Sequence, residues 1–464
     1  MSDTDPALMT AEALLENYAR RRLSPVEALR AVTERIARHN PRLNAFAVMN
    51  PGALRAAGES EARWAAGRPI GLLDGVPATV KDLLNMAGFP TRRGSKTTDA
   101  APATEDAPAV MGLKQAGAVI IGKTTTTEFG WKSPGDCPLH GITRNPWDRE
   151  RTVGGSSSGA GAAGAACFGP LHVGTDAGGS VRIPATFCGL VGLKPSFGRI
   201  PQWPLGAFAN VACAGPMTRT VRDAALMFSV MAQHDLRDPF SLPEEARDWR
   251  RGIEDGVAGL RIGLVRRLGF APPLDADGEA ALAGAAKLLE QQGAIVEEAD
   301  PMLPDTRAIF GRVWGVALAR LVSTIPAEKR ALLDAGLEDV AEREGGMSAI
   351  DFLGAEALRI EAAHAAARFH QRYDLMLTAT TPTAAFAADQ PTIRPTEALW
   401  RDWAPWTFAF NLTRQPAITV PIGLDEAGMP RAVQLAAALY RDDLVFRGAR
   451  ALEQAAAIPL AEPA

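Results

Sequence analysis

The stretch that decides the fold runs from residue 154 to residue 199 and reads GGSSSGAGAAGAACFGPLHVGTDAGGSVRIPATFCGLVGLKPSFGR. Glycine and serine crowd two segments of it, 154–161 and 174–180, which a helix of small residues joins. Glycine lets backbone amides approach a ligand closely, and a serine hydroxyl becomes a nucleophile when a base takes its proton. The two segments therefore predict a site at which backbone N–H groups and hydroxyls converge.

Three other interpretations of this stretch are weaker. A flexible Gly/Ser linker would not continue into the apolar run 187–193. The G-x-G-x-x-G match at Gly159, Gly161 and Gly164 lacks the buried strand and the acidic residue that a dinucleotide site needs. The G-x-S-x-G match at residues 155–159 needs a preceding strand and a later Asp and His, but the downstream His364 and His370 lie in an Ala-rich helical stretch.

The stretch resembles the amidase signature family in three matching pieces that come in the same order. Members carry a near-identical glycine/serine block, with a second serine at the spacing by which Ser180 follows Ser156, 24 positions. They also carry a lysine far upstream in a G-V-P-x-x-V-K-D segment, and residues 75–82 here read GVPATVKD, with the lysine at Lys81. The resemblance extends from about Thr10 to the last expected helix, at residues 441–454, and so covers nearly the whole chain.

This resemblance implies a Ser–Ser–Lys triad, a relative of the Ser–Lys variants of the serine triad. By position, Ser180 is the nucleophile, Ser156 the bridging serine and Lys81 the base. In the family a cis peptide bond holds the bridging serine. The pKa of lysine in water is about 10.4, so Lys81 can act as a base only if burial lowers its pKa. The apolar residues that flank Lys81 agree with such burial.

Further residues are expected to support this chemistry. Asp176 and Arg182 flank the nucleophile, and their family counterparts hold the loops; Ser157 and Thr175 are expected to hydrogen-bond within the site. An oxyanion that forms on the substrate needs preorganised donors, and a nest of consecutive backbone amides can supply them. These amides are expected to be those of Ala177, Gly178, Gly179 and Ser180.

The order of apolar and polar segments predicts an α/β fold, a single large domain over residues 1–464. The resemblance implies a central mixed, mostly parallel sheet that helices cover on both faces. The parts expected are an N-terminal helical hairpin at about 10–40, a signature core at about 70–235 and a variable helical segment at about 305–371. Strands are expected at 118–122, 261–265, 294–298 and 373–378, a hairpin near the sheet edge at 417–421 and 432–435, and a helix that opens at 215–223.

Composition limits the possible partners. The net charge of −4 and the absence of any Lys/Arg run of five or more argue against a nucleic-acid footprint. The sequence shows no signal peptide and no long apolar span, and the four cysteines and six histidines form no metal or redox motif. We expect a cytoplasmic monomer or homodimer that acts on a small amide-type substrate without metal, cofactor, nucleic acid or membrane.

Aromatic residues favour a pocket for neutral, hydrophobic acyl or aryl groups. The sequence alone does not identify an arginine that binds a substrate carboxylate. Arg144, Arg199 and Arg414 remain candidates for that role. The aromatic and apolar residues expected around the site are Phe129, Trp131, Trp203, Leu205, Phe208, Trp403, Trp406 and Phe410.

The predicted function is hydrolysis of carboxylic-acid amides. Two alternatives stay open. The same triad could hydrolyse carbamates or esters, because the acyl-transfer steps barely distinguish these carbonyl groups. The chain could also be the catalytic subunit of a tRNA-dependent amidotransferase, which shares the triad and needs partner subunits.

Overall fold

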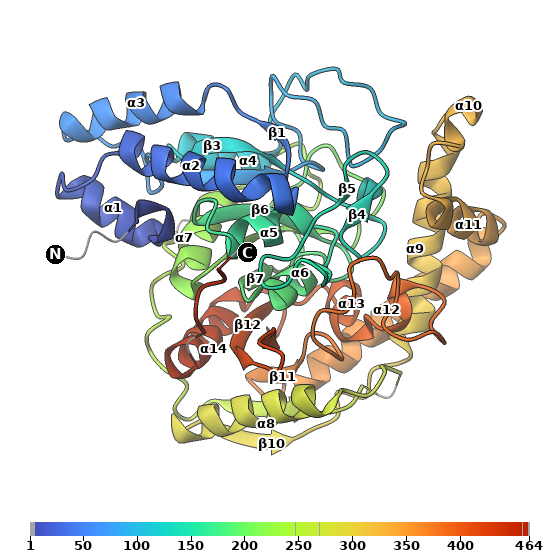
Figure 1. The fold of residues 1–464 in the computed structure, drawn as a ribbon. Helices are drawn as coiled ribbons and strands as arrows, with labels where there is room; N and C mark the ends of the chain where they lie inside the picture. Colours follow the sequence, from blue (N-terminus) through green and yellow to red (C-terminus); the bar gives the residue numbers. More distant parts are fainter. Residues whose placement is uncertain (1–4, 246, 269, 457, 463–464) are drawn as a thin grey trace.

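An eleven-stranded sheet runs through the computed structural model, which describes residues 5–245, 247–268, 270–456 and 458–462 (Figure 1). The strand order is β1 (Phe46–Met49), β3 (Val119–Thr124), β2 (Pro77–Lys81), β6 (Leu171–Asp176), β8 (Cys213–Thr218), β7 (Val191–Lys194), β12 (Ala417–Leu424), β13 (Pro430–Ala437), β11 (Leu375–Ala379), β9 (Arg261–Val265) and β10 (Ile295–Glu298). The sheet is mixed. Parallel strands lie in two groups, β3–β2–β6 and β11–β9–β10, and β8, β7, β12 and β13 join these groups through antiparallel pairs. A small second sheet pairs β4 (Asp136–Cys137) with β5 (Gly141–Ile142).

Helices cover both faces of the large sheet, as the sequence predicted. One face packs against α4 (Pro108–Gln115), α7 (Val221–Met231), α8 (Ala276–Gln291) and α14 (Asp442–Ala455). The other face packs against α5 (Ser158–Ala165), α6 (Arg182–Cys188) and α13 (Pro405–Leu412). Among the described helices, none has the length and apolar character needed to cross a membrane.

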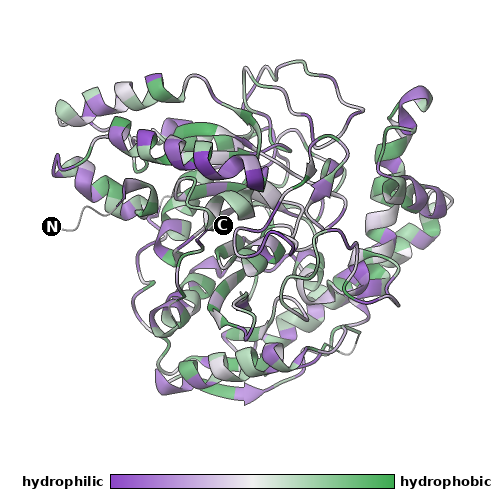
Figure 2. Cartoon of the chain, viewed as in Figure 1, coloured by the Kyte–Doolittle hydropathy of each residue, from purple (hydrophilic) through white to green (hydrophobic). Residues whose placement is uncertain are grey.

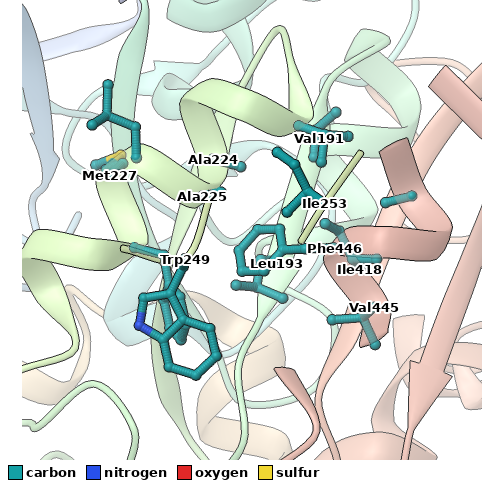
Figure 3. Close-up of a cluster of buried hydrophobic side chains, with 14 of the residues drawn as sticks. Val191, Leu193, Ala224, Ala225, Met227, Trp249, Ile253, Ile418, Val445 and Phe446 are labelled. Carbon is teal, nitrogen blue, oxygen red and sulfur yellow. The ribbon is translucent and has the colours of Figure 1, made fainter. Parts of the chain in front are cut away.

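The largest apolar core fills the space between the first of these faces and its helices. Leu193 and Ile418 project from the sheet, and Phe446 of α14 meets them (Figure 3). Trp249 and Ile253, from the connection after α7, pack in the same cluster. Burial of such apolar surface is the main favourable term in folding, so this core fixes the sheet against its helices.

Two N-terminal helices, α1 (Ala11–Ala19) and α2 (Pro25–Leu43), form where the hairpin at about 10–40 was expected, and α3 (Ala53–Ala65) follows them. The Ser24 hydroxyl accepts from the backbone N–H of Glu27, and the Glu27 carboxylate accepts from that of Ser24. This reciprocal capping box satisfies N–H groups that the first turn cannot. Hydrophilic and hydrophobic residues alternate along α2, whose apolar side faces the protein (Figure 2).

The segment predicted as helical at about 305–371 forms an arm on one side of the sheet (Figure 1). The helices of the arm are α9 (Thr306–Ser323), α10 (Ala327–Arg330), α11 (Ala335–Glu344) and α12 (Ala349–Phe369). Among the described residues, three short helices lie outside the arm: η1 (Pro6–Leu8), η2 (Glu128–Gly130) and η3 (Trp400–Asp402). A second aromatic core attaches the arm. The Phe208 ring stacks on Trp314 of α9 with ring centroids 3.6 Å apart, and Phe310 stacks on Phe408 of α13 at 4.2 Å.

Two predictions from the sequence were wrong. The hairpin of β12 and β13 lies inside the sheet, flanked by β7 and β11, and not near its edge. Residues 215–218 belong to β8 and not to a helix, and α7 begins only after Thr220, whose hydroxyl accepts from the N–H of Asp223. Glycine and proline disfavour strands locally, but an added Cβ at Gly215 would lie 2.0 Å from the Leu193 carbonyl oxygen. Close packing between neighbouring strands therefore overrides the local preference.

The close contact of α4 with α7 generates a stability prediction. A Cβ at Gly112 of α4 would lie 2.3 Å from the Val230 carbonyl oxygen of α7. Gly112→Ala is therefore expected to lower the free energy of unfolding by about 1–3 kcal/mol, the usual cost of overpacking. No atom of the described residues lies within 4 Å of a Cβ at Gly58 in α3, so Gly58→Ala should raise the free energy of unfolding by about 0.5–1 kcal/mol. Urea unfolding of both variants measures this, and equal midpoints would contradict it.

Candidate active site

Lys81, the last residue of β2, has a fully buried side chain that three hydroxyl groups surround. Its Nζ lies 2.7 Å from Ser156 Oγ, 2.9 Å from Ser157 Oγ and 2.9 Å from Thr175 Oγ1. β2 lies between β3 and β6 and runs parallel to both, so the ends of these strands meet at one edge. The fold thus brings together four residues that the sequence predicted for the site.

The surroundings of Lys81 favour its neutral form. Burial lowers the pKa of Lys81 well below its usual range, and the negative charge of Asp176 only partly opposes this. The Ser157 hydroxyl donates to the Thr175 carbonyl at 3.3 Å, so the Ser157 oxygen accepts from Lys81. When neutral Lys81 donates its two N–H groups to Ser157 and Thr175, its lone pair faces Ser156. This arrangement can accept a proton from the Ser156 hydroxyl.

Ser156 sits at a tight junction just before α5. The Gly155–Ser156 peptide bond is cis, as the resemblance implied, and the Ser156 carbonyl accepts from the N–H of Thr127 at 3.3 Å. Helix α5 approaches the end of β3 closely at Gly159, where a Cβ would lie 2.2 Å from the Ala45 oxygen and 2.4 Å from the Thr125 nitrogen. The small residues of α5 therefore let Ser156 reach Lys81.

The loop that carries Ser180 folds around the carboxylate of Asp176. The N–H groups of Gly179 and Val181 donate to it at 2.8 and 3.1 Å, and the Arg182 guanidinium donates at 2.9 and 3.0 Å. Burial alone would raise the pKa of Asp176, but the charge and hydrogen bonds of Arg182, with a hydrogen bond from Asn411, bring it well below its usual value. These contacts favour the ionised form of Asp176 and tie its carboxylate to the loop.

Arg182 connects this loop to distant segments. Its fully buried guanidinium donates to the Thr407 carbonyl and to Asn411 Oδ1 in α13, and to Gln434 Oε1 in β13, at 2.8–2.9 Å. Gly179 has φ +119°, and a Cβ there would lie 2.3 Å from Thr407 Oγ1. Only glycine fits at that position of the loop.

The backbone amides of this loop divide into two groups. The Gly179 N–H, expected as an oxyanion donor, donates instead to Asp176 and is already satisfied. The N–H groups of Ala177, Gly178 and Ser180 donate to no acceptor in the described part of the chain. Three of the four predicted amides are thus free to bind an oxyanion.

A cavity of about 420 Å³ opens beside these groups. Ser156, Thr175, Ala177 and Ser180 line it, and among the described residues the Ser180 hydroxyl has no hydrogen-bond partner. The other lining residues are Leu83, Leu84, Arg93, Thr97, Thr98, Phe129, Gly130, Gln202, Trp203, Pro204, Leu205, Gly206, Ala207, Phe208, Ala212, Leu321, Thr324, Ile325 and Pro326.

The structure places some of the aromatic residues expected around the site on the cavity wall and others elsewhere. Phe129, Trp203 and Phe208 line the cavity, together with Leu205. Trp131 does not: only 4% of it is exposed, and its ring packs against Gly336 of α11, where a Cβ would lie 2.8 Å away. The arm buries this ring. The other aromatic residues of the prediction, Trp403, Trp406 and Phe410, are buried in the apolar cores.

Sequence reasoning missed Arg93 and the end of α9. Leu321 to Pro326 come to the cavity because the arm folds back, and no local signal in the sequence predicts such a contact. The Asp334 carboxylate pairs with Lys132 Nζ at 2.6 Å, and the Asp334 N–H donates to the buried Glu128 carboxylate at 2.7 Å. These contacts fix the arm against the residues that follow β3.

The three arginines left open by the sequence lie away from the cavity lining. Arg199 pairs with Glu245 at 3.0 Å, and the Arg414 guanidinium lies 4.3 Å from the centre of the Phe197 ring. Arg144 donates to the Arg149 carbonyl at 3.0 Å. Arg93, in the loop after β2, is instead the charged residue that reaches the cavity.

Comparisons with known proteins agree with this geometry. The sequence model of the Amidase family matches residues 27–446. An acylamidase of Rhodococcus erythropolis is 35% identical over 461 residues, which cover 98% of this chain and 96% of that protein. The A-subunit of the glutamyl-tRNA(Gln) amidotransferase of Geobacter metallireducens is 33% identical, with 97% of each chain covered. A solved bacterial aryl acylamidase of the amidase signature family superposes with a TM-score of 0.89 at 27% identity, covering 96% of each chain.

The buried ion pair generates a test of the loop. Arg182→Met removes the guanidinium and leaves Asp176 as a buried, unpaired carboxylate, so it is expected to destabilise the protein by about 3–5 kcal/mol. Adding Asp176→Asn removes that charge and should recover part of the loss. Chemical denaturation of the single and double variants measures both effects. If the double variant were no more stable than Arg182→Met, the unpaired charge would not be the cause.

Proposed function

Because the chain belongs to the amidase signature family and is an amide hydrolase, we propose that Lys81, Ser156 and Ser180 cleave the substrate through an acyl-enzyme. The observation that carries this proposal is the contact of the buried Lys81 Nζ with Ser156 Oγ at 2.7 Å, in a site that opens on the cavity lined by Ser180. A buried neutral amine beside a hydroxyl is a base without a competing counter-ion.

The reaction starts when Lys81 accepts the proton of Ser156 while Ser156 accepts that of Ser180. The Ser180 oxygen then forms a bond to the substrate carbonyl carbon, and the carbonyl oxygen becomes an oxyanion. The free amides of Ala177, Gly178 and Ser180 stabilise that charge. The proton returns through Ser156 to the leaving nitrogen as the C–N bond breaks. Water then attacks the acyl-enzyme by the same route and releases the acid and Ser180.

The proposed substrates are amides with hydrophobic or aryl groups. Phe129, Trp203, Leu205 and Phe208 give the cavity largely apolar walls, and pockets of this kind bind apolar bodies with few polar contacts. The similarity to an acylamidase and to an aryl acylamidase supports the same substrate class.

Two alternatives use the same groups. Carbamates and esters present a carbonyl to the same nucleophile and the same amides, so the triad could also cleave them. Similarity to the A-type chains of tRNA-dependent amidotransferases favours the second alternative, a subunit that acts on an amide only with partner proteins. Turnover of a simple amide by the purified chain alone, without ATP, tRNA or partner proteins, separates the first proposal from the last.

The triad is tested by substitution in that purified chain. Ser180→Ala should abolish anilide hydrolysis and covalent labelling by a fluorophosphonate, because the attacking oxygen is gone. Lys81→Ala should lower kcat by at least about 10²–10⁴-fold, the usual contribution of a general base. Ser157→Ala, which removes one acceptor of Lys81 and no reacting atom, should be milder than either. Wild-type turnover by Ser180→Ala would refute the assignment.

The protonation of Lys81 predicts the pH dependence. The base is active when neutral, and its pKa is lowered well below the usual range by burial. Activity should therefore be low in acid and rise as pH increases through this lowered pKa, towards neutral or alkaline pH. The measurement is kcat/KM for a non-titrating anilide between pH 4 and pH 10. A rate that peaked below pH 5 would contradict a neutral lysine base.

A further inference from the structure

Arg93 is the one charged residue among the described residues that line the active-site cavity. Its guanidinium donates no hydrogen bond and forms no ion pair within the described part of the chain. Guanidinium carries five N–H donors in a planar fork, and none of those of Arg93 is among the buried unpartnered atoms of the described residues, so they are accessible to a ligand. Arg93 is half-buried and lines both this cavity and a neighbouring hollow, so its donors lie beside the space that a substrate can occupy.

The backbone of Arg93 is held in an unusual conformation beside the triad. Arg93 has φ 54° and Phe129, on the cavity wall, has φ 49°, a region that side-chain-bearing residues seldom adopt. The Phe129 N–H donates to the Arg93 carbonyl at 2.8 Å, and the Arg93 N–H donates at 3.1 Å to the carbonyl of Asp82, the residue after Lys81. Such conformations persist where surrounding structure enforces them, often at functional sites.

Nearby carboxylates leave the charge of Arg93 available. Asp82 already pairs with the buried Lys123 at 2.8 Å. Asp99 is exposed and borders a neighbouring polar hollow, which Arg93 and Lys329 also line. Arg93 and Lys329 outnumber the one carboxylate around this hollow, so the residues that line it carry a net positive charge.

We propose that Arg93 binds a carboxylate of the substrate, and that the enzyme selects amides with an apolar acyl or aryl body and a carboxylate at a second point. A guanidinium binds a carboxylate through two parallel hydrogen bonds, which fix orientation as well as charge. This inference rests on the proposed amidase function and narrows its substrate class. It replaces the expectation from sequence that the preferred substrates are neutral.

The test compares matched anilide substrates. In the first pair, the acyl chain ends in a carboxylate or in the isosteric carboxamide; in the second, the anilide ring carries the carboxylate or the carboxamide. The readout is the ratio of kcat/KM within each pair, at low salt. Wild-type protein should favour the carboxylate in one pair by about tenfold or more, as charge-assisted hydrogen bonds do, and that pair identifies the side of the scissile bond that Arg93 faces.

Variants assign the preference to Arg93. Arg93→Gln should bring the favoured ratio to about one or below, while Arg93→Lys should keep part of it, because a lysine retains charge but not the planar fork. Lys96→Gln makes the same charge change at an exposed residue of the same loop and should keep the wild-type ratio. Fluorophosphonate labelling of Ser180 confirms that each variant is folded.

Failure of this inference can be distinguished from failure of the proposed function. A wild-type ratio near one in both pairs, or a preference that Arg93→Gln leaves intact, overturns the role of Arg93 while amide hydrolysis stands. Wild-type protein that is neither labelled by the fluorophosphonate nor active on any of the four compounds overturns the proposed function itself. A lost preference in Arg93→Gln, with labelling retained, supports both.

Discussion

The buried ion pair of Asp176 and Arg182 is the interaction on which the geometry of the site depends. A carboxylate without water must be fully hydrogen-bonded or it is very costly, and Asp176 meets this demand by drawing in the N–H groups of Gly179 and Val181. The loop therefore curls around the carboxylate. The N–H groups of Ala177, Gly178 and Ser180 do not donate to the Asp176 carboxylate. They are the groups proposed to bind the oxyanion.

The same ion pair also acts on the proposed base. Asp176 raises the pKa of Lys81 by its charge, but burial, the larger cause, lowers that pKa, and the contacts of Nζ are hydroxyls. The neighbouring strand offers a contrast, because the buried Lys123 of β3 has Asp82 at 2.8 Å as a direct counter-ion. A lysine held by a carboxylate keeps its proton more strongly than one held by hydroxyls. Arg182 offsets the negative charge of Asp176. It therefore limits how far that charge raises the pKa of Lys81, which favours loss of the Lys81 proton.

The sequence predicted those parts of the site that short segments encode. Lys81 ends a buried strand, and Ser156 and Ser180 belong to glycine-rich segments with a recognisable spacing. It failed where distant segments decide the outcome. Gly215 and Pro216 disfavour a strand locally, so the sequence did not predict β8. Its pairing with β6 and β7 explains why a strand forms there. Phe129 and Trp131 are aromatic residues close in sequence, and the sequence gives no reason to expect different environments for them. Packing of the arm buries Trp131, whereas Phe129 lies on the cavity wall.

Arg93 was missed for a related reason, and its position suggests how chemistry and substrate choice are connected. A large part of the cavity wall comes from residues 202–208 and from the end of α9, segments that make no contact with Lys81 in the described hydrogen-bond network. They can shape the pocket without disturbing the proton path.

Arg93 differs, because its backbone joins the carbonyl of Asp82 to the N–H of Phe129. A residue fixed between the base and the pocket wall holds its charged group at a defined place relative to the reacting hydroxyls. A carboxylate bound there would orient the scissile carbonyl as well as add affinity, because one end of the substrate would be fixed while the other reaches Ser180.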